Sequence, residues 1–198
     1  MILEGLMTTT NLDGTVNVSP MGPLVDERLS VFTLRPFQTS TTYRNLKRNG
    51  VGVFHVTDDV ELLAHAAVGA MTSPPAVRQL PGFEAYVLAD ACRWFQLQVE
   101  ELDDQSERTT IVCRSVKSAE QRPFFGLNRA KHAVVEAAIV ATRLHLISRE
   151  EVERQLVALR PLVEKTAGDA ERRAFAFLEA HVAEHYARSA AAVEAGHG

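Results

Sequence analysis

Apolar and polar residues alternate in short runs over most of the first 120 positions, and turn signals separate these runs. Alternation with a period of two predicts strands, and an Asp-Gly pair between two runs predicts a hairpin. Asp13-Gly14 therefore joins the first two expected strands. The six expected strands are residues 2–10, the run from Val16, 29–34, 51–57, 94–102 and 109–117. Six antiparallel strands hide their edges best in a closed or nearly closed barrel.

Two helices are expected between these strands. The first covers residues 41–48 and ends at Asn49-Gly50, a pair typical of a helix C-terminus. The second covers 59–70, with Asp58 or Asp59 as its cap. Residues 72–82 contain three prolines and are expected to form a loop.

Beyond Pro123, strand-forming residues give way to Ala, Glu, Arg and Leu at helical spacing. We therefore expect one domain over residues 1–122 and a helical C-terminal domain over 123–198. Its three helices are expected at 128–146, after the capping box that begins at Ser148, and after Gly168-Asp169. Pro161 is expected to kink the middle helix or to end it early.

The composition is ordinary: 198 residues, 46% hydrophobic, 23% charged and a formal net charge of -4. This balance does not favour nucleic acid or an anionic membrane as a partner. No apolar run approaches the roughly 20 residues of a membrane span, and the first residues lack a signal-peptide pattern, so we expect a cytoplasmic protein. A hairpin turning near residues 104–105 would place Cys113 opposite Gln96, so no disulfide with Cys92 is expected.

The most informative stretch lies between the third strand and the first helix. An arginine ends the strand, and four consecutive hydroxyl residues open the helix: Arg35, then Gln38, Thr39, Ser40, Thr41 and Thr42. A helix N-terminus offers unpaired N–H groups and a partial positive charge, to which hydroxyls and a guanidinium add donors. The pattern indicates a phosphate site. The alternative is a plain helix cap, which would explain only one hydroxyl.

A second stretch follows the first hairpin turn. Asn17 and Ser19 project to the face opposite Val16 and Val18, and the segment Pro20-Met21-Gly22-Pro23 holds extended backbone without a full hydrogen-bond ladder. Such a backbone can meet the edge of a flat heteroaromatic ring. The alternative interpretation is an edge strand with a polar outer face.

The order of these motifs, with Tyr43-Arg44-Asn45-Leu46 and the strand 52–57, resembles the flavin-reductase-like FMN-binding split β-barrels. More closely, residues 1–185 resemble the family of domains of unknown function number 447. The resemblance implies a six-stranded split barrel with two inserted helices, a three-helix appendage, and a homodimer with FMN at the subunit interface. It assigns the phosphate to the hydroxyl turn and the isoalloxazine to Asn17, Ser19, Pro20 and Met21, bordered by His55, Val56 and Thr57. Many flavin reductases carry lysine and aspartate beside the threonine, a place where this chain has only hydroxyls.

Two further motifs contain residue types that bind ligands or metals. Asn128 and Arg129, after a pair of phenylalanines, are candidate contacts to substrate or phosphate, or they form a solvated first helical turn. His181 and His185 match the His-x-x-Glu-His pattern of inverted zinc peptidases, but a third ligand is missing, so we interpret them as part of an amphipathic helix with no metal.

The sequence thus predicts an FMN-binding flavoprotein, with an oxidoreductase of unknown substrate as the first hypothesis. A flavin carrier or sensor without turnover, using the helical part as a partner surface, is the alternative. An FMN-dependent enzyme needs no catalytic triad, because the cofactor supplies the redox chemistry.

Overall fold

The computed structural model describes residues 1–71, 73–80 and 85–195. The chain folds as two compact units. The barrel unit comprises residues 1–58 and 72–125, and the helical unit comprises 59–71 and 126–198. The second expected helix, within 59–71, therefore belongs to the helical unit rather than to the barrel that precedes and follows it in the sequence.

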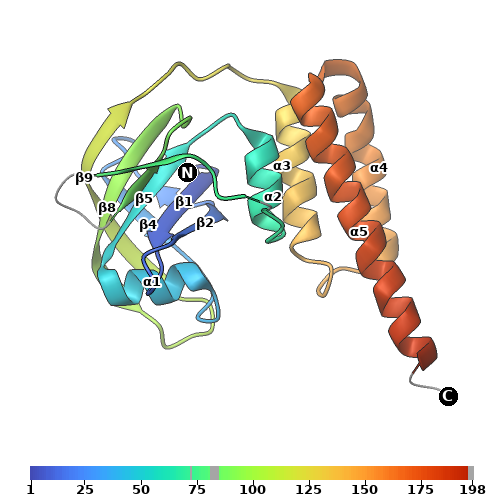
Figure 1. Cartoon of the computed structure of the whole chain (residues 1–198), viewed down its shortest axis with the longest axis horizontal. Coiled ribbons are helices and arrows are strands. Elements are labelled where there is room, and N and C mark those ends of the chain that lie inside the picture. The colour runs from blue at the N-terminus through green and yellow to red at the C-terminus, as the bar shows by residue number, and fades with distance from the viewer. Residues whose placement is uncertain (72, 81–84, 196–198) are drawn as a thin grey trace. The chain divides into compact units, whose positions relative to one another are not determined.

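The barrel unit is built on one curled antiparallel sheet of seven strands in the order β2-β1-β5-β8-β9-β4-β3 (Figure 1). All six expected strands are present. The sheet adds a two-residue strand, β3, which is too short to show a periodic pattern. The bounds are β1 Gly5–Thr10, β2 Val16–Met21, β3 Leu24–Val25, β4 Val31–Leu34, β5 Val51–Val56, β8 Arg93–Asp103 and β9 Thr110–Glu120.

The N-terminal residues draw the two ends of this strand order together. Ile2 forms a bridge with Leu24, and the N–H of Val25 donates to the carbonyl of Met1 at 2.9 Å. The same segment continues into β1, which pairs with β2 and β5. Because one segment thus pairs with both ends of the order, the sheet curls toward a barrel, which confirms the split-barrel architecture.

The expected loop at 72–82 is partly wrong. The structure forms a separate two-stranded sheet from β6 (Val77–Gln79) and β7 (Tyr86–Leu88), while residues 72, 81 and 82 lie outside the described part. Pro74 and Pro75 precede the paired residues, so neither removes an N–H from the hairpin. Pro74 and Pro75 are therefore compatible with a strand that begins shortly after them.

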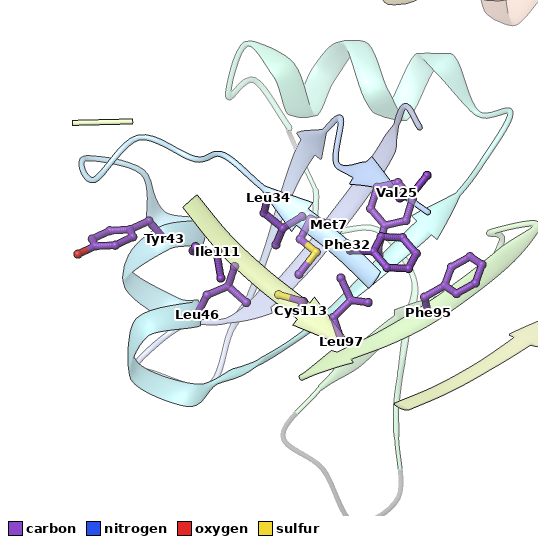
Figure 2. Packing of buried hydrophobic residues seen from close by; sticks show 11 residues of the cluster. Met7, Val25, Phe32, Leu34, Tyr43, Leu46, Phe95, Leu97, Ile111 and Cys113 are labelled. Atoms are coloured by element: carbon purple, nitrogen blue, oxygen red, sulfur yellow. The ribbon is translucent and has the colours of Figure 1, made fainter. Parts of the chain in front are cut away.

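The core of the barrel unit is a cluster on the concave side of the sheet, closed at one end by α1 (Thr41–Asn49). Figure 2 shows Leu46 of the helix beside Ile111 and Cys113 of the sheet, with Tyr43 at the margin of the group. Three phenylalanines stack in tilted pairs, with ring centroids 5.2 and 5.6 Å apart. The buried members are Met7, Val25, Phe32, Leu34, Tyr43, Leu46, Phe54, Phe95, Leu97, Ile111 and Cys113.

The expected register of the long hairpin is wrong. Cys113 pairs with Val99, whereas Gln96 pairs with Lys117. The connection runs from residue 104 to 109 instead of turning at two residues, and register shifts occur between Gln96 and Leu97 and again beyond Val99. Cys92 and Cys113 are both free and buried, and burial raises the pKa of the Cys113 thiol to about 12.

The helical unit contains α2 (Val60–Ala67), α3 (Arg129–Ala141), α4 (Arg149–Thr166) and α5 (Asp169–Ala195). Each of the first three has a side-chain cap: Asp59, Asn128 and Ser148 accept hydrogen bonds from the N–H three residues on. Asp59 is thus the cap of α2, one of the two expected candidates. The helix expected to reach residue 146 ends at Ala141.

Pro161 does not end α4 early, contrary to one of the two outcomes expected for it. The helix continues to Thr166, with Leu156 and Val163 buried on either side of the proline. Pro161 itself is exposed, as is Val157, whose carbonyl would normally accept a hydrogen bond from residue 161. This carbonyl can face water, so the missing bond costs little compared with the packing retained.

Candidate functional site at the start of helix α1

Helix α1 begins at Thr41, within the run of four hydroxyl residues from Thr39 to Thr42. Ser40 is its cap, and the Ser40 hydroxyl accepts a hydrogen bond from the N–H of Tyr43 at 3.1 Å. Gly50 ends the helix in the left-handed conformation, with φ of 67°, as the Asn-Gly pair predicted. The first turn carries no acidic residue. An anion arriving at this N-terminus would therefore meet no carboxylate in the turn itself.

Thr42 is buried and bonds within the protein. Its hydroxyl is 2.6 Å from the Ser19 hydroxyl and accepts a hydrogen bond from the Asn17 amide at 3.1 Å. The Asn17 amide also donates to Thr9, which receives a second bond from Asn45. Thr9, Thr42 and Asn45 are almost fully buried. The structure thus brings Asn17, Ser19 and Thr42 together, in a network that fastens β2 to α1.

Thr41 and Arg44 form the outward side of the same turn. The Arg44 guanidinium donates to the Thr39 carbonyl at 2.6 Å and to the Thr41 hydroxyl at 3.1 Å. A guanidinium is thereby held at the positive end of the helix macrodipole, where a cation is electrostatically unfavourable by itself. Arg35 is exposed, and within the described residues its side chain has no hydrogen bond or ion pair.

The loop between β8 and β9 supplies another arginine. Arg108 Nε donates to the Arg35 carbonyl at 3.3 Å, and its guanidinium lies 5.7 Å from the centroid of the Phe37 ring. Gln38 holds the loop in place: its amide donates to the carbonyls of Asp104 and Ser106 at 2.6 and 2.9 Å. The amide nitrogen of Gln38 is therefore engaged within the protein.

A second tie joins this loop to the helix. Tyr43 Oη donates to Asp104 at 2.6 Å, and Lys47 Nζ donates to the same carboxylate at 2.6 Å. The hydrogen bond from Lys47, followed by that from Tyr43, lowers the pKa of Asp104. The Asp104 carboxylate in turn raises the pKa of Lys47 above its usual value. Because these charges neutralise each other, the uncompensated cations of this region are the arginines.

The residues expected to border the flavin ring lie on β5 and directly after it. His55 is fully buried, and its Nδ1 lies 3.2 Å from the Leu6 carbonyl while Nε2 accepts from the Leu88 N–H at 3.1 Å. Burial lowers its pKa from 6.5 to about 4, so the ring is neutral with Nδ1 protonated. Both ring nitrogens are thus used to tie β5 to β1 and β7. The Val56 carbonyl accepts from the Cys92 N–H, and Thr57 is partly buried.

Pro20 and Met21 lie on β2, which pairs with β1 alone among the strands of the described residues. The other side of this edge strand keeps its backbone groups unpaired by the sheet, consistent with the proline in it. Asn128 and Arg129 belong to the helical unit. The Asn128 amide caps α3 and donates to the Thr166 carbonyl at 3.0 Å, while Arg129 is exposed.

Sequence reasoning missed three participants. Thr9 and Asn45 join the buried polar network, and Arg108 lies beside Arg35. Asn45 could have been found, because it stands three residues after Thr42 and so shares its helix face. Arg108 carries no local signal, since the hairpin that presents it is joined to residues 35–38 only by the fold.

The described residues contain neither a metal-binding cluster nor a membrane-spanning helix. No cluster of three or more His, Cys, Asp or Glu side chains suited to hold a metal ion occurs there, and this includes the described histidines of α5. Nor does any helix in these ranges combine the length and apolar character needed to cross a membrane.

The curled antiparallel sheet, closed by a helix that follows a hydroxyl-rich turn, places the chain among the split-barrel proteins. Two family models match it: the protein of unknown function (DUF447) N-terminal domain over residues 3–122, and protein of unknown function (DUF447) over residues 128–180. The chain belongs to this DUF447 family. A search of curated proteins gave no match.

Solved structures with a similar fold include an FMN-bound protein, a flavin reductase and a flavoredoxin. An FMN-bound DUF447 protein from Methanosarcina mazei has a TM-score of 0.80 and 21% identity, with 91% of this chain and 94% of that chain covered. The styrene monooxygenase flavin reductase of Pseudomonas putida has a TM-score of 0.51 and 15% identity over 61% and 80% of the two chains. Flavoredoxin from Methanosarcina acetivorans has a TM-score of 0.51 and 12% identity over 61% and 69%. At these identities the likenesses establish the fold alone.

Proposed function

We propose that this protein binds FMN and holds the FMN phosphate at the N-terminus of α1. The observation that carries the proposal is the Arg44 guanidinium fixed on Thr39 and Thr41 at the positive end of the helix, with Arg35 and Arg108 beside the same turn. Cations gathered at a helix N-terminus repel each other and oppose the dipole, and a dianionic phosphate relieves both effects. The residues present therefore fit a phosphate group.

The geometry also divides the hydroxyl run by role. Ser40 caps the helix and Thr42 bonds inward, which leaves the Thr39 and Thr41 hydroxyls as the better candidates for the phosphate. For the isoalloxazine we propose the exposed edge of β2 at Ser19, Pro20 and Met21, with Asn17 positioning that strand through Thr42. We further propose that His55 holds β5 against β1 and β7 and that its ring nitrogens do not contact the ligand.

Two features of the proteins with this fold support FMN as the ligand. The DUF447 protein from Methanosarcina mazei is FMN-bound, and two other similar structures are a flavin reductase and a flavoredoxin. FMN supplies hydride or electron transfer when bound, and the protein supplies binding and orientation. We therefore propose an oxidoreductase of the flavin-reductase-like type, in a homodimer whose partner subunit covers the β2 edge.

The phosphate site is tested by comparing FMN with riboflavin, which lacks the phosphate. The variant Arg35→Ala/Thr41→Ala should bind FMN at least about tenfold more weakly, since charged hydrogen bonds contribute about 1.5–3 kcal/mol each. Its riboflavin affinity should stay unchanged. Arg28→Ala, which removes an exposed arginine elsewhere in the barrel unit, is the matched control. Equal losses for both ligands, in a folded variant, would place the phosphate elsewhere.

Turnover is tested separately from binding. FMN-loaded protein mixed anaerobically with NADH or NADPH should lose its flavin absorbance if it is a reductase using these donors. A stable spectrum with both donors favours the flavin carrier or sensor instead. Sedimentation velocity of the loaded protein tests the homodimer, and a monomer that binds FMN at full affinity would contradict the interface site.

A further inference from the structure

The convex side of the barrel sheet carries a small group of buried polar atoms that lack partners. Gln96 is 1% exposed and Trp94 is 3% exposed. Neither amide atom of Gln96, nor Trp94 Nε1, has a hydrogen-bond partner in the described part of the chain. The two residues are two apart on β8, so their side chains project to the same face.

The Trp94 ring lies among apolar side chains, and Gln96 lies opposite Val53 of the same cluster. Trp94 packs in a cluster with Val53 from β5, Val87 from β7, and Leu80 and Ala85 next to the β6–β7 hairpin. This layer is distinct from the concave core, which takes the alternate residues Phe95 and Leu97. An apolar shell cannot satisfy an amide or an indole N–H, and leaving each such atom unpaired is expensive.

We infer that an internal water molecule is bound between the Gln96 amide and the Trp94 indole. A water can accept a hydrogen bond from Trp94 Nε1 and donate one to Gln96 Oε1, and buried waters typically make two to four such bonds. The three unpaired atoms meet that number. Near-complete burial of both side chains favours water over any larger polar ligand.

Trp94 makes the site directly observable because it is the only tryptophan in the chain. In a ¹H–¹⁵N spectrum its indole N–H gives one assignable signal, and a long-lived bound water should give a cross-relaxation peak between that proton and the water resonance. Hydroxyl protons also exchange with water, and Thr8 on β1 carries a buried hydroxyl opposite Val53, the residue that pairs with Gln96; this hydroxyl donates to the Tyr86 carbonyl at 2.5 Å. Repeating the measurement on Thr8→Val removes that relay.

The sign of a stability change gives an independent test. If water satisfies the amide, Gln96→Met removes hydrogen bonds and leaves the indole unpaired, so the unfolding equilibrium constant should rise about 5- to 30-fold. If the amide is truly unpaired, the same substitution removes an unfavourable buried group and the constant should fall. Gln98→Met is the matched control, because Gln98 lies two residues further along β8 and its side-chain hydrogen bond, to the Gly50 carbonyl, is exposed to solvent.

The expected result is an indole–water peak that persists in Thr8→Val, together with a destabilised Gln96→Met. A missing peak combined with a stabilised Gln96→Met would overturn the inference. If Gln96→Met does not fold, the indole–water peak of the unmodified protein decides alone. A high-resolution crystal structure would locate the bound water. Electron density for an organic molecule at that position would also refute the assignment.

Discussion

Lowering the pH should destabilise the barrel unit through one residue, His55. The His55 ring is neutral in the folded protein because burial lowers its pKa from 6.5 to about 4. In the unfolded chain the ring recovers its ordinary pKa and binds a proton about 300-fold more tightly, a difference worth about 3 kcal/mol. Stability from this group is therefore complete above pH 6.5 and is lost as the pH falls toward 4.

The expected loss of stability is large enough to measure between pH 8 and pH 5. Between pH 8 and pH 5 the unfolded chain takes up the proton and the folded protein does not, so the free energy of unfolding should fall by about 2 kcal/mol. Urea titrations followed by Trp94 fluorescence report on the barrel unit, and a change of this size lowers the midpoint by about 1 M. His55 is the only histidine in residues 1–58 and 72–125, so no other imidazole of that unit contributes.

Two histidine variants separate the contribution of His55 to the pH dependence from that of the carboxylates. His55→Gln should be less stable at pH 8 but should lose much less stability between pH 8 and pH 5 than the unmodified protein. His145→Gln, which alters an exposed histidine of the helical unit, should keep the full dependence. An unchanged pH dependence in folded His55→Gln, or an NMR titration of the His55 ring with a midpoint near 6.5, would refute the reasoning.

Two substitutions test the packing of the same unit. A methyl group at Gly5 would lie 2.2 Å from the backbone carbonyl oxygen of His55 on the neighbouring strand, so Gly5→Ala should cost about 3 kcal/mol in thermal or urea unfolding; a loss below about 1 kcal/mol would mean that the strands separate easily. Asp58→Ala removes a buried carboxylate that binds Arg122 through both oxygens at 2.6 and 3.1 Å, and should cost about 3 kcal/mol. The exposed pair of Glu100 provides the comparison, since Glu100→Gln should change stability by less than about 1 kcal/mol.

Most strands and caps could be predicted from local pattern because local physics specifies them. The Asp-Gly turn, the Asn-Gly end of α1 and the Ser148 cap each satisfy backbone groups within a few residues. The predictions that were wrong concern strands whose pairing depends on residues far away in the sequence. β3 exists because Leu24 and Val25 pair with β4 and with the N-terminal residues, and the bulges in β8 and β9 follow from curling of the sheet.

His55 shows why site residues are harder to assign. A histidine in the middle of an apolar strand suggests a ligand contact, but the Leu6 carbonyl and the Leu88 N–H that satisfy its ring come from 49 residues before and 33 residues after it. No spacing in the sequence reveals such partners. The neutral ring links β5 to β1 and β7 through these two hydrogen bonds, which form only when the three strands are brought together.

Once the first residue of α1 is known, Thr41 and Thr42 can be assigned to different faces of the helix. Residues three apart share a helix face, so Thr41 goes with Arg44 and Thr42 goes with Asn45. The first pair is outward and joined by a hydrogen bond, and the second is buried with Asn17. It follows that Thr41→Val should weaken FMN binding with little effect on stability, whereas Thr42→Val should destabilise α1 and disturb β2 before any ligand is added. Equal effects of the two substitutions on both measurements would contradict this division.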